Sequence, residues 1–312
     1  MTLDGKLVKW LLDGDISIRY QVYKYLLADD RTELRDRIAD EGWGAHYLSL
    51  RGQDGHWGEG FYQPKWTSTH YTLLDLRNME ISPDIPIVQK VIEKILIEEK
   101  GRDGGVNPAR SLNNSDVCIN GMFLCYACYF GEKEDNLKTV VDFLLEEQMS
   151  DGGFNCRSNR SGAMHSSMHT TISVLEGILE YFSRGYTYRA DEMKKAARGS
   201  EEFLLTHKLY LSDRTGNIID EKFTRLPYPA RWRYDILRAL EYFADAGNDY
   251  DDRMKPAINL LISKRNKNGK WPLNAKHPGQ VHIEFEKAGK ESRINTLRAL
   301  KVLKHFDFLK YL

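Results

Sequence analysis

The sequence predicts an all-α protein made of helical hairpins that repeat about every fifty residues. Five loops with Asp-Gly, Thr-Gly or Asn-Gly turns end in an aromatic or aliphatic residue, and they occupy residues 53–57, 102–106, 148–154, 214–218 and 266–271. Their last residues are 49, 48, 64 and 53 residues apart. Such turns are tight because Asp, Asn and Gly tolerate left-handed backbone angles. The recurrence divides the chain into similar units.

The segments between these loops have helical periodicity. Apolar residues recur at spacings of three and four within residues 88–96, 137–144 and 258–262. Pro86 and Pro256 stand near two of the expected helix starts, where a missing amide donor costs little. Few windows alternate strictly between apolar and polar residues, so we expect no sheet.

Each repeat is expected to consist of a loop, a helix, a short turn and a second helix. The helix before a loop is rich in charge, as in residues 89–94, whereas the helix after it, as in residues 118–127, is almost uncharged. A helix that is apolar all round is buried. We therefore predict an (α/α) toroid, with inner and outer helices and the Gly-rich loops at one rim. One domain is expected over residues 1–312, with 1–50 as an N-terminal cap or closing segment and 51–312 as about five hairpin repeats.

Composition excludes several classes of protein. Among 312 residues, 45 Lys and Arg balance 45 Asp and Glu, and this neutrality argues against a nucleic-acid binder. No apolar run approaches the ~18 residues of a membrane span. The N-terminus lacks the features of a signal peptide. We expect a cytoplasmic protein, either a monomer or a homodimer, with its four cysteines as free thiols.

Three helix starts can be aligned so that metal-binding side chains share one position. Aligning residues 68–73, 116–121 and 167–172 places His70, Cys118 and His169 at one level, with Asp116 beside them. Zinc favours about four Cys, His and carboxylate ligands, and a catalytic site leaves one position open. The alignment predicts a zinc site, in which His70 or His165 could provide a fourth ligand. Taken singly, the same residues are ordinary: Asp116 as an N-cap, Cys118 as core and His169 as a hydrogen-bonded neighbour.

At these loops the chain resembles the terpenoid-cyclase and protein-prenyltransferase superfamily. Residues 53–57 (QDGHW) are similar to the glutamine–tryptophan motif of squalene cyclases, and residues 151–177 to a prenyltransferase β-subunit repeat. The whole chain resembles uncharacterised bacterial squalene-cyclase-like proteins. This resemblance implies an α/α toroid, and zinc held by Asp116, Cys118 and His169.

The resemblance also implies a diphosphate clamp, of which only one residue matches. Arg110 stands at the expected arginine position, but Asn113 and Ile119 replace the family's lysine and tyrosine. Other cations near loops or inner-helix starts could compensate; these are Arg157, Arg160, Arg231, Arg233 and Arg293. Tyr234 and Asp235 open a later inner helix and could assist as acid–base groups.

The expected function is that of a zinc-dependent, prenyltransferase-like enzyme. Its substrate would be a small apolar molecule such as an isoprenoid, or a thiol-bearing one, held among Trp57, Trp66, Tyr71 and Phe154. Two alternatives stay open. One is a class II terpene cyclase with Asp116 as the acid, and the other is a non-catalytic toroid that binds a lipid or peptide. Residues 282–286 (HIEFE), in a long loop, have no assignment.

Overall fold

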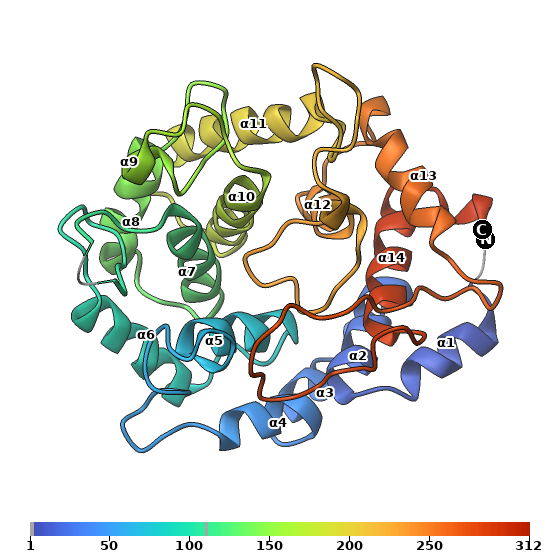
Figure 1. Cartoon of the computed structure of the whole chain (residues 1–312). Coiled ribbons are helices and arrows are strands. Elements are labelled where there is room, and N and C mark those ends of the chain that lie inside the picture. The colour runs from blue at the N-terminus through green and yellow to red at the C-terminus, as the bar shows by residue number, and fades with distance from the viewer. Residues whose placement is uncertain (1–2, 110–111) are drawn as a thin grey trace. The chain divides into compact units, whose positions relative to one another are not determined.

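The computed structural model describes residues 3–109 and 112–312, and within these ranges it contains helices and no β-strand (Figure 1). The described residues contain three isolated antiparallel β-bridges, which pair Lys100 with Val106, Leu211 with Ile218 and Pro272 with Glu291. None of the helices in these ranges is long and apolar enough to cross a membrane. The prediction of an all-α protein is confirmed.

The chain forms two compact units. The first, here the central unit, comprises Arg51–Arg77 and Pro83–Leu205, and the second, here the terminal unit, comprises Met1–Leu50, Asn78–Ser82 and Thr206–Leu312. The expectation of a single domain over the whole chain stays a prediction.

The central unit contains long helices that follow the predicted hairpin order. Its elements are η2 (Lys65–Thr67), α5 (Thr69–Asn78), α6 (Pro86–Glu98), α7 (Val117–Tyr129), α8 (Glu134–Glu146), α9 (Ser158–Ser161), α10 (Met168–Ser183) and α11 (Ala190–Thr206), of which α5 and α11 each end one residue beyond it. Nearly every residue of α7 is buried, whereas α6 and α8 each bury one stripe. The predicted difference between inner and outer helices is confirmed for these three.

Helices α7 and α10 cross at unusually close range, side by side in Figure 1. A side chain at Gly121 would place its Cβ 2.7 Å from the carbonyl carbon of Ser173, and one at Gly177 would lie 2.5 Å from the Gly121 carbonyl oxygen. Glycine at both positions therefore permits backbone-to-backbone packing.

The terminal unit joins the first and last parts of the chain. Its elements are α1 (Gly5–Leu12), α2 (Ile16–Gln21), the π-helix η1 (Val22–Leu26), α3 (Thr32–Arg37), α4 (Gly42–Ser49), η3 (Glu221–Thr224), α12 (Ile236–Asp245), η4 (Asp252–Met254), α13 (Lys255–Ser263), α14 (Arg293–His305) and η5 (Leu309–Tyr311). Helix α14 packs against α12, α1 and α2. Arg293 Nε donates to the Trp10 carbonyl at 2.8 Å, and Lys304 Nζ to the Tyr25 carbonyl at 2.9 Å.

One hydrogen bond recurs between a loop and the helix that follows it. The amide of the last loop residue donates to a side chain in the first turns of that helix: Trp57 to Thr69 Oγ1 at 3.0 Å, Val106 to Asn120 Oδ1 at 2.6 Å, Phe154 to Thr171 Oγ1 at 3.0 Å and Trp271 to Thr296 Oγ1 at 3.0 Å. The four loop residues are at most 1% exposed. The loop at 214–218 departs from this pattern, because Ile218 is 39% exposed. Four of the five predicted loops thus share one anchor, which we call the loop anchor.

We predict that the Thr171→Val substitution destabilises the protein by about 1–3 kcal/mol, the cost of leaving a buried donor unsatisfied. Valine has nearly the shape of threonine but cannot accept the Phe154 amide. Urea unfolding followed by circular dichroism measures the change. Thr187→Val, at an exposed position, is the matched control and should change stability by less than about 0.5 kcal/mol. Equal effects of the two substitutions would show that the loop anchor does not stabilise the fold.

Candidate functional site

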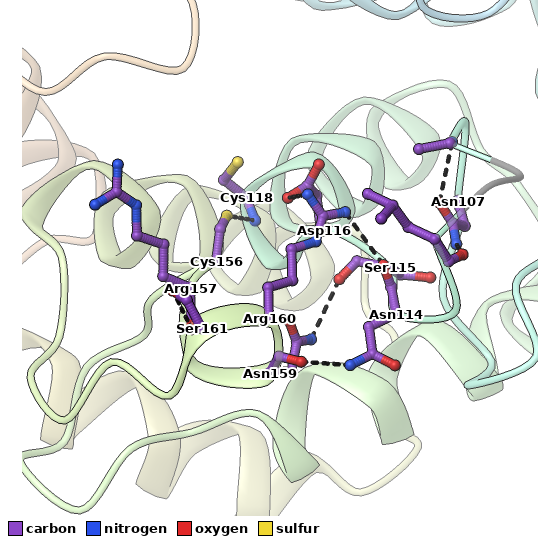
Figure 2. A network of polar contacts seen from close by, with 12 residues as sticks. Asn107, Asn114, Ser115, Asp116, Cys118, Cys156, Arg157, Asn159, Arg160 and Ser161 are labelled. Carbon is purple, nitrogen blue, oxygen red and sulfur yellow. Dashed lines mark hydrogen bonds and ion pairs between the residues drawn. The ribbon is translucent and has the colours of Figure 1, made fainter.

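Asp116 begins α7 and faces a cation. It is the N-cap residue, yet in the described structure its carboxylate makes no capping hydrogen bond and instead pairs with Arg160, with Oδ1 and Nη1 3.0 Å apart (Figure 2). Burial raises the pKa of Asp116, and the charge of Arg160 opposes that shift. Arg160 also donates to the Asn114 carbonyl at 3.2 Å. These contacts hold the segment around α9 against the start of α7.

Two cysteines from different segments meet beside this ion pair. The Cys118 amide donates to Cys156 Sγ at 3.1 Å (Figure 2). The Thr170 hydroxyl lies 3.5 Å from the same sulfur. Both residues are partly exposed, whereas Cys125 and Cys128 are buried within α7. We call Cys118 and Cys156 the thiol pair.

His70 is a core histidine. It is fully buried, its Nδ1 lies 3.1 Å from the Tyr126 hydroxyl, and rings of Phe61, Tyr62 and Tyr71 surround it. Burial lowers its pKa to about 3, so the ring is neutral.

The predicted alignment of metal ligands is wrong for His70, and the loop anchor shows why. Cys118 and His169 each precede their anchor residue, Asn120 or Thr171, by two positions, whereas His70 follows its own, Thr69, by one. The equivalent of Cys118 in the first repeat is therefore Thr67. Among the residues that the structure describes, no three His, Cys, Asp or Glu side chains are grouped to hold a metal ion. The predicted set of Asp116, Cys118, His169 and His70 is not assembled.

Two further predicted residues are Arg110 and Tyr234. Arg110 lies outside the described residues, and Tyr234 makes a hydrogen bond to the backbone. The Tyr234 hydroxyl is buried and donates to the Leu209 carbonyl at 2.5 Å. This bond ties the start of α12 to the beginning of the segment that follows α11.

Asp235 is the N-cap of α12 and is 1% exposed. Its Oδ1 accepts the Arg238 amide at 2.9 Å, while its Oδ2 is buried and has no hydrogen-bond partner within the described ranges. Burial raises the pKa of Asp235 to about 6, although Arg298 and Arg238 oppose the shift. An acid with such a pKa can exchange a proton near neutral pH.

A small pocket in the terminal unit gathers charged and aromatic side chains from two loops. Residues 228–231, before α12, and 273–288, before α14, line it, and its volume is about 30 Å³. Such a space holds one or two waters, or a group the size of a carboxylate. We call it the arginine pocket, after Arg231, which is 5% exposed and has a left-handed backbone with φ of 60°. A non-glycine residue in that region stores strain of the kind found at functional sites.

His277 lines the arginine pocket in its neutral form. Its ring donates to the Ala230 carbonyl, and its Nε2 has no hydrogen-bond partner among residues 3–109 and 112–312. Burial, together with Arg233 and Arg231, lowers the pKa of His277 to about 4. At neutral pH its Nε2 is an unprotonated base beside two cations.

Arg233, predicted to bind a cofactor, stacks on a ring, and its positive charge helps to lower the pKa of His277. Its guanidinium carbon lies 4.6 Å from the centre of the Trp232 ring. Its Nε is buried and makes no hydrogen bond within the described part of the chain.

Aromatic rings pack beside the arginine pocket. Phe285, which lines it, contacts Trp43 at 4.9 Å and Tyr228 at 5.3 Å between ring centres, and stacks on Tyr47 at 5.9 Å. Aromatic faces of this kind can pack against the apolar side of a sugar ring.

The sequence analysis did not select Tyr228, His277 or Cys156. A usable signal for His277 was the length of the stretch from 272 to 292, because long irregular loops inside a compact protein are usually functional. The signal for Cys156 is weaker, since the residue stands alone in a loop.

Comparisons with known proteins point away from the expected family. No family model matches the chain, and no curated protein matches it. A solved structure of a polysaccharide lyase is similar over 95% of this chain and 90% of its own, with a TM-score of 0.54 and 12% identity. A glycosyl hydrolase of family 88 from Bacteroides vulgatus is similar over 93% of this chain and 89% of its own, with a TM-score of 0.49 and 13% identity.

These findings correct the predicted family and function. The resemblance to terpenoid cyclases and prenyltransferases is wrong, and so are the expected zinc-dependent prenyl-transfer function, its cyclase and lipid-binding alternatives, and the apolar or thiol-bearing substrate. Short Gly-rich loops and polar helix-start residues recur in folds of this type, because the tight turns and helix ends require them for backbone geometry. The fold class itself, an all-α (α/α) toroid, is confirmed.

Asp235 should give stability a characteristic pH dependence. Its pKa rises from 3.8 to about 6 on folding, so between these values the folded state binds more protons than the unfolded state. The free energy of unfolding must therefore fall as pH rises through this range, by about 3 kcal/mol in total, since one pKa unit corresponds to about 1.4 kcal/mol. In Asp235→Asn, which keeps the capping oxygen, urea unfolding across pH should lose this slope.

The control for this measurement is Asp220→Asn. Asp220 also caps a helix, since it accepts the Lys222 amide at 2.8 Å, and its replacement should leave the wild-type slope unchanged. An unchanged slope in Asp235→Asn would contradict the raised pKa.

Proposed function

We propose that the protein cleaves an acidic polysaccharide beside a uronate residue by β-elimination. The observation that carries this proposal is the neutral His277 that lines a pocket of carboxylate size together with Arg231, with Arg233 near enough to help lower the pKa of the histidine. The similarity in fold to a polysaccharide lyase supports it.

The reaction needs three groups, and the arginine pocket offers a candidate for each. Arg231, which lines the pocket, binds the uronate carboxylate, and its charge and that of the nearby Arg233 stabilise the negative charge that develops as the neighbouring proton is removed. His277 Nε2 is the base that takes this proton, because its lowered pKa keeps it unprotonated. The Tyr228 hydroxyl donates a proton to the departing sugar oxygen.

Atoms and electrons balance in this step. The bond between hydrogen and the carbon that bears the carboxylate breaks, and its electrons form a double bond to the next ring carbon. The bond from that carbon to the bridging oxygen breaks in turn, and the oxygen receives the proton from Tyr228. Neither an oxidant nor a water molecule is consumed, and the products are an unsaturated uronate and a free hydroxyl end.

A second candidate is hydrolysis with Asp235 as the general acid. It is favoured by the raised pKa of about 6 and by the buried Oδ2, which has no hydrogen-bond partner among the described residues. Hydrolysis would produce new reducing ends without the unsaturated product.

The test is to incubate the purified protein with pectic, alginate and glycosaminoglycan polymers, and with neutral glucans for comparison. Ultraviolet absorbance reports the unsaturated uronate, and a reducing-end assay reports all cleavage. We expect both signals with at least one acidic polymer and neither with neutral glucans. Reducing ends without absorbance would favour hydrolysis, and cleavage of neutral glucans alone would overturn both readings of the pocket.

Replacement of His277 should abolish most of the activity. Loss of a general base typically costs about 10²–10⁴-fold in rate, so we expect a decrease of this size in kcat for His277→Ala. His46→Ala, at an exposed position on α4, is the matched control and should retain wild-type kcat. Equal activity of the two variants would exclude His277 as the base.

The pH profile gives an independent check. His277 faces Arg231, Arg233, Lys276, Glu284 and Glu286, and its pKa is about 4. The wild-type kcat/KM should therefore remain high down to about pH 5 and fall as pH drops through about 4, whereas an ordinary histidine would lose activity near pH 6.5. An acid limb centred near 6.5 would contradict the assignment.

A further inference from the structure

The thiol pair lies in the central unit and has no part in the proposed reaction. Cys118 is the second residue of α7, and Cys156 follows the loop that ends in Phe154. The Cys118 amide lies 3.1 Å from Cys156 Sγ, and Figure 2 shows the two side chains together at the start of α7. Two cysteines placed this close are candidates for a disulfide.

The surroundings of the two sulfurs are not equivalent. Cys156 Sγ accepts the Cys118 amide at 3.1 Å, one of the amides at the start of α7 that lack a partner within the helix. It also accepts the Thr170 hydroxyl at 3.5 Å. Both of these hydrogen bonds are donated to Cys156 Sγ, and such donors stabilise a thiolate. Cys156 is therefore the sulfur of the pair that is better placed to react first.

Access also separates this pair from the other cysteines. Cys118 and Cys156 are partly exposed, and Cys125 and Cys128 are at most 1% exposed. A small oxidant in solution can reach the pair, while the buried thiols are shielded.

We propose that Cys156 and Cys118 form a peroxide-reactive pair, in which Cys156 is oxidised first and Cys118 then closes a disulfide. In the first step the Cys156 thiolate attacks one oxygen of a hydroperoxide. The O–O bond breaks, Cys156 becomes a sulfenic acid, and hydroxide or an alkoxide leaves. In the second step the Cys118 sulfur attacks the Cys156 sulfur, the S–O bond breaks, and water leaves with the Cys118 proton.

The disulfide would join the start of α7 to the segment that carries α9. That segment supplies Arg160 to Asp116, so oxidation would lock an arrangement that the reduced protein holds by an ion pair and hydrogen bonds.

The experiment treats the full chain with hydrogen peroxide, blocks remaining thiols with an alkylating reagent and maps peptides by mass spectrometry without reductant. We expect two of the four thiols to disappear, with residues 118 and 156 linked in one peptide pair. A dimedone reagent added to Cys118→Ser should capture a sulfenic acid on Cys156. In Cys156→Ser, loss of the Cys118 thiol should be at least about tenfold slower than in the wild type.

Cys125→Ser is the matched control, because it removes a buried thiol from the same helix and should oxidise like the wild type. Thermal unfolding confirms that each variant is folded before treatment. Oxidation of Cys125 or Cys128 at the same rate as Cys156 would overturn the proposal, as would thiol loss without a link between 118 and 156.

Discussion

The hydrogen bond from a buried loop amide to a side chain of the following helix is the constraint on which the repeats depend. It joins Phe154 to Thr171 in one repeat and Trp271 to Thr296 in another, with the same polarity. The loop residue is buried, so its amide must find an acceptor inside the protein. One threonine or asparagine provides it, and thereby fixes the distance between the turn and the helix start. Helices α7, α10 and α14 accordingly each begin three residues before their anchor side chain.

This constraint explains which sequence expectations hold. The loops, the charge-poor helices after them and the starts of α7, α10 and α14 follow from turn chemistry and apolar periodicity, which are local properties. The position of His70 does not follow, because α5 begins three residues later in its repeat, after the short helix η2. An alignment based on helix starts alone therefore places His70 three residues away from the true equivalent of Cys118 and His169. The threonine and asparagine residues can be read from the sequence, but their hydrogen bonds to loop amides can be recognised only in the tertiary structure.

The candidate groups differ in how far a sequence can reveal them. Asp235 and Arg233 stand at or just before a helix start, so the repeat pattern identifies them as candidates. The burial that raises the pKa of Asp235 is seen only in the structure. His277 and Cys156 lie in irregular segments without periodicity, and their chemistry comes from partners far along the chain or across a loop. The family resemblance failed for a related reason. Its motifs are turn and helix-start residues, which many chains of this fold need for backbone geometry alone.

The overall charge of the chain is a poor guide to its ligand. Formal net charge is zero, and this balance argues against a broad basic surface. Within the terminal unit, however, Arg231 and Lys276 line one small pocket together with Glu284 and Glu286, while His277 in the same pocket stays neutral. A single carboxylate responds to this local field, which acts over a few ångströms and at low dielectric, rather than to the sum over the surface. Selectivity for a polyanion can therefore arise from repeated engagement of one carboxylate pocket, without a basic protein.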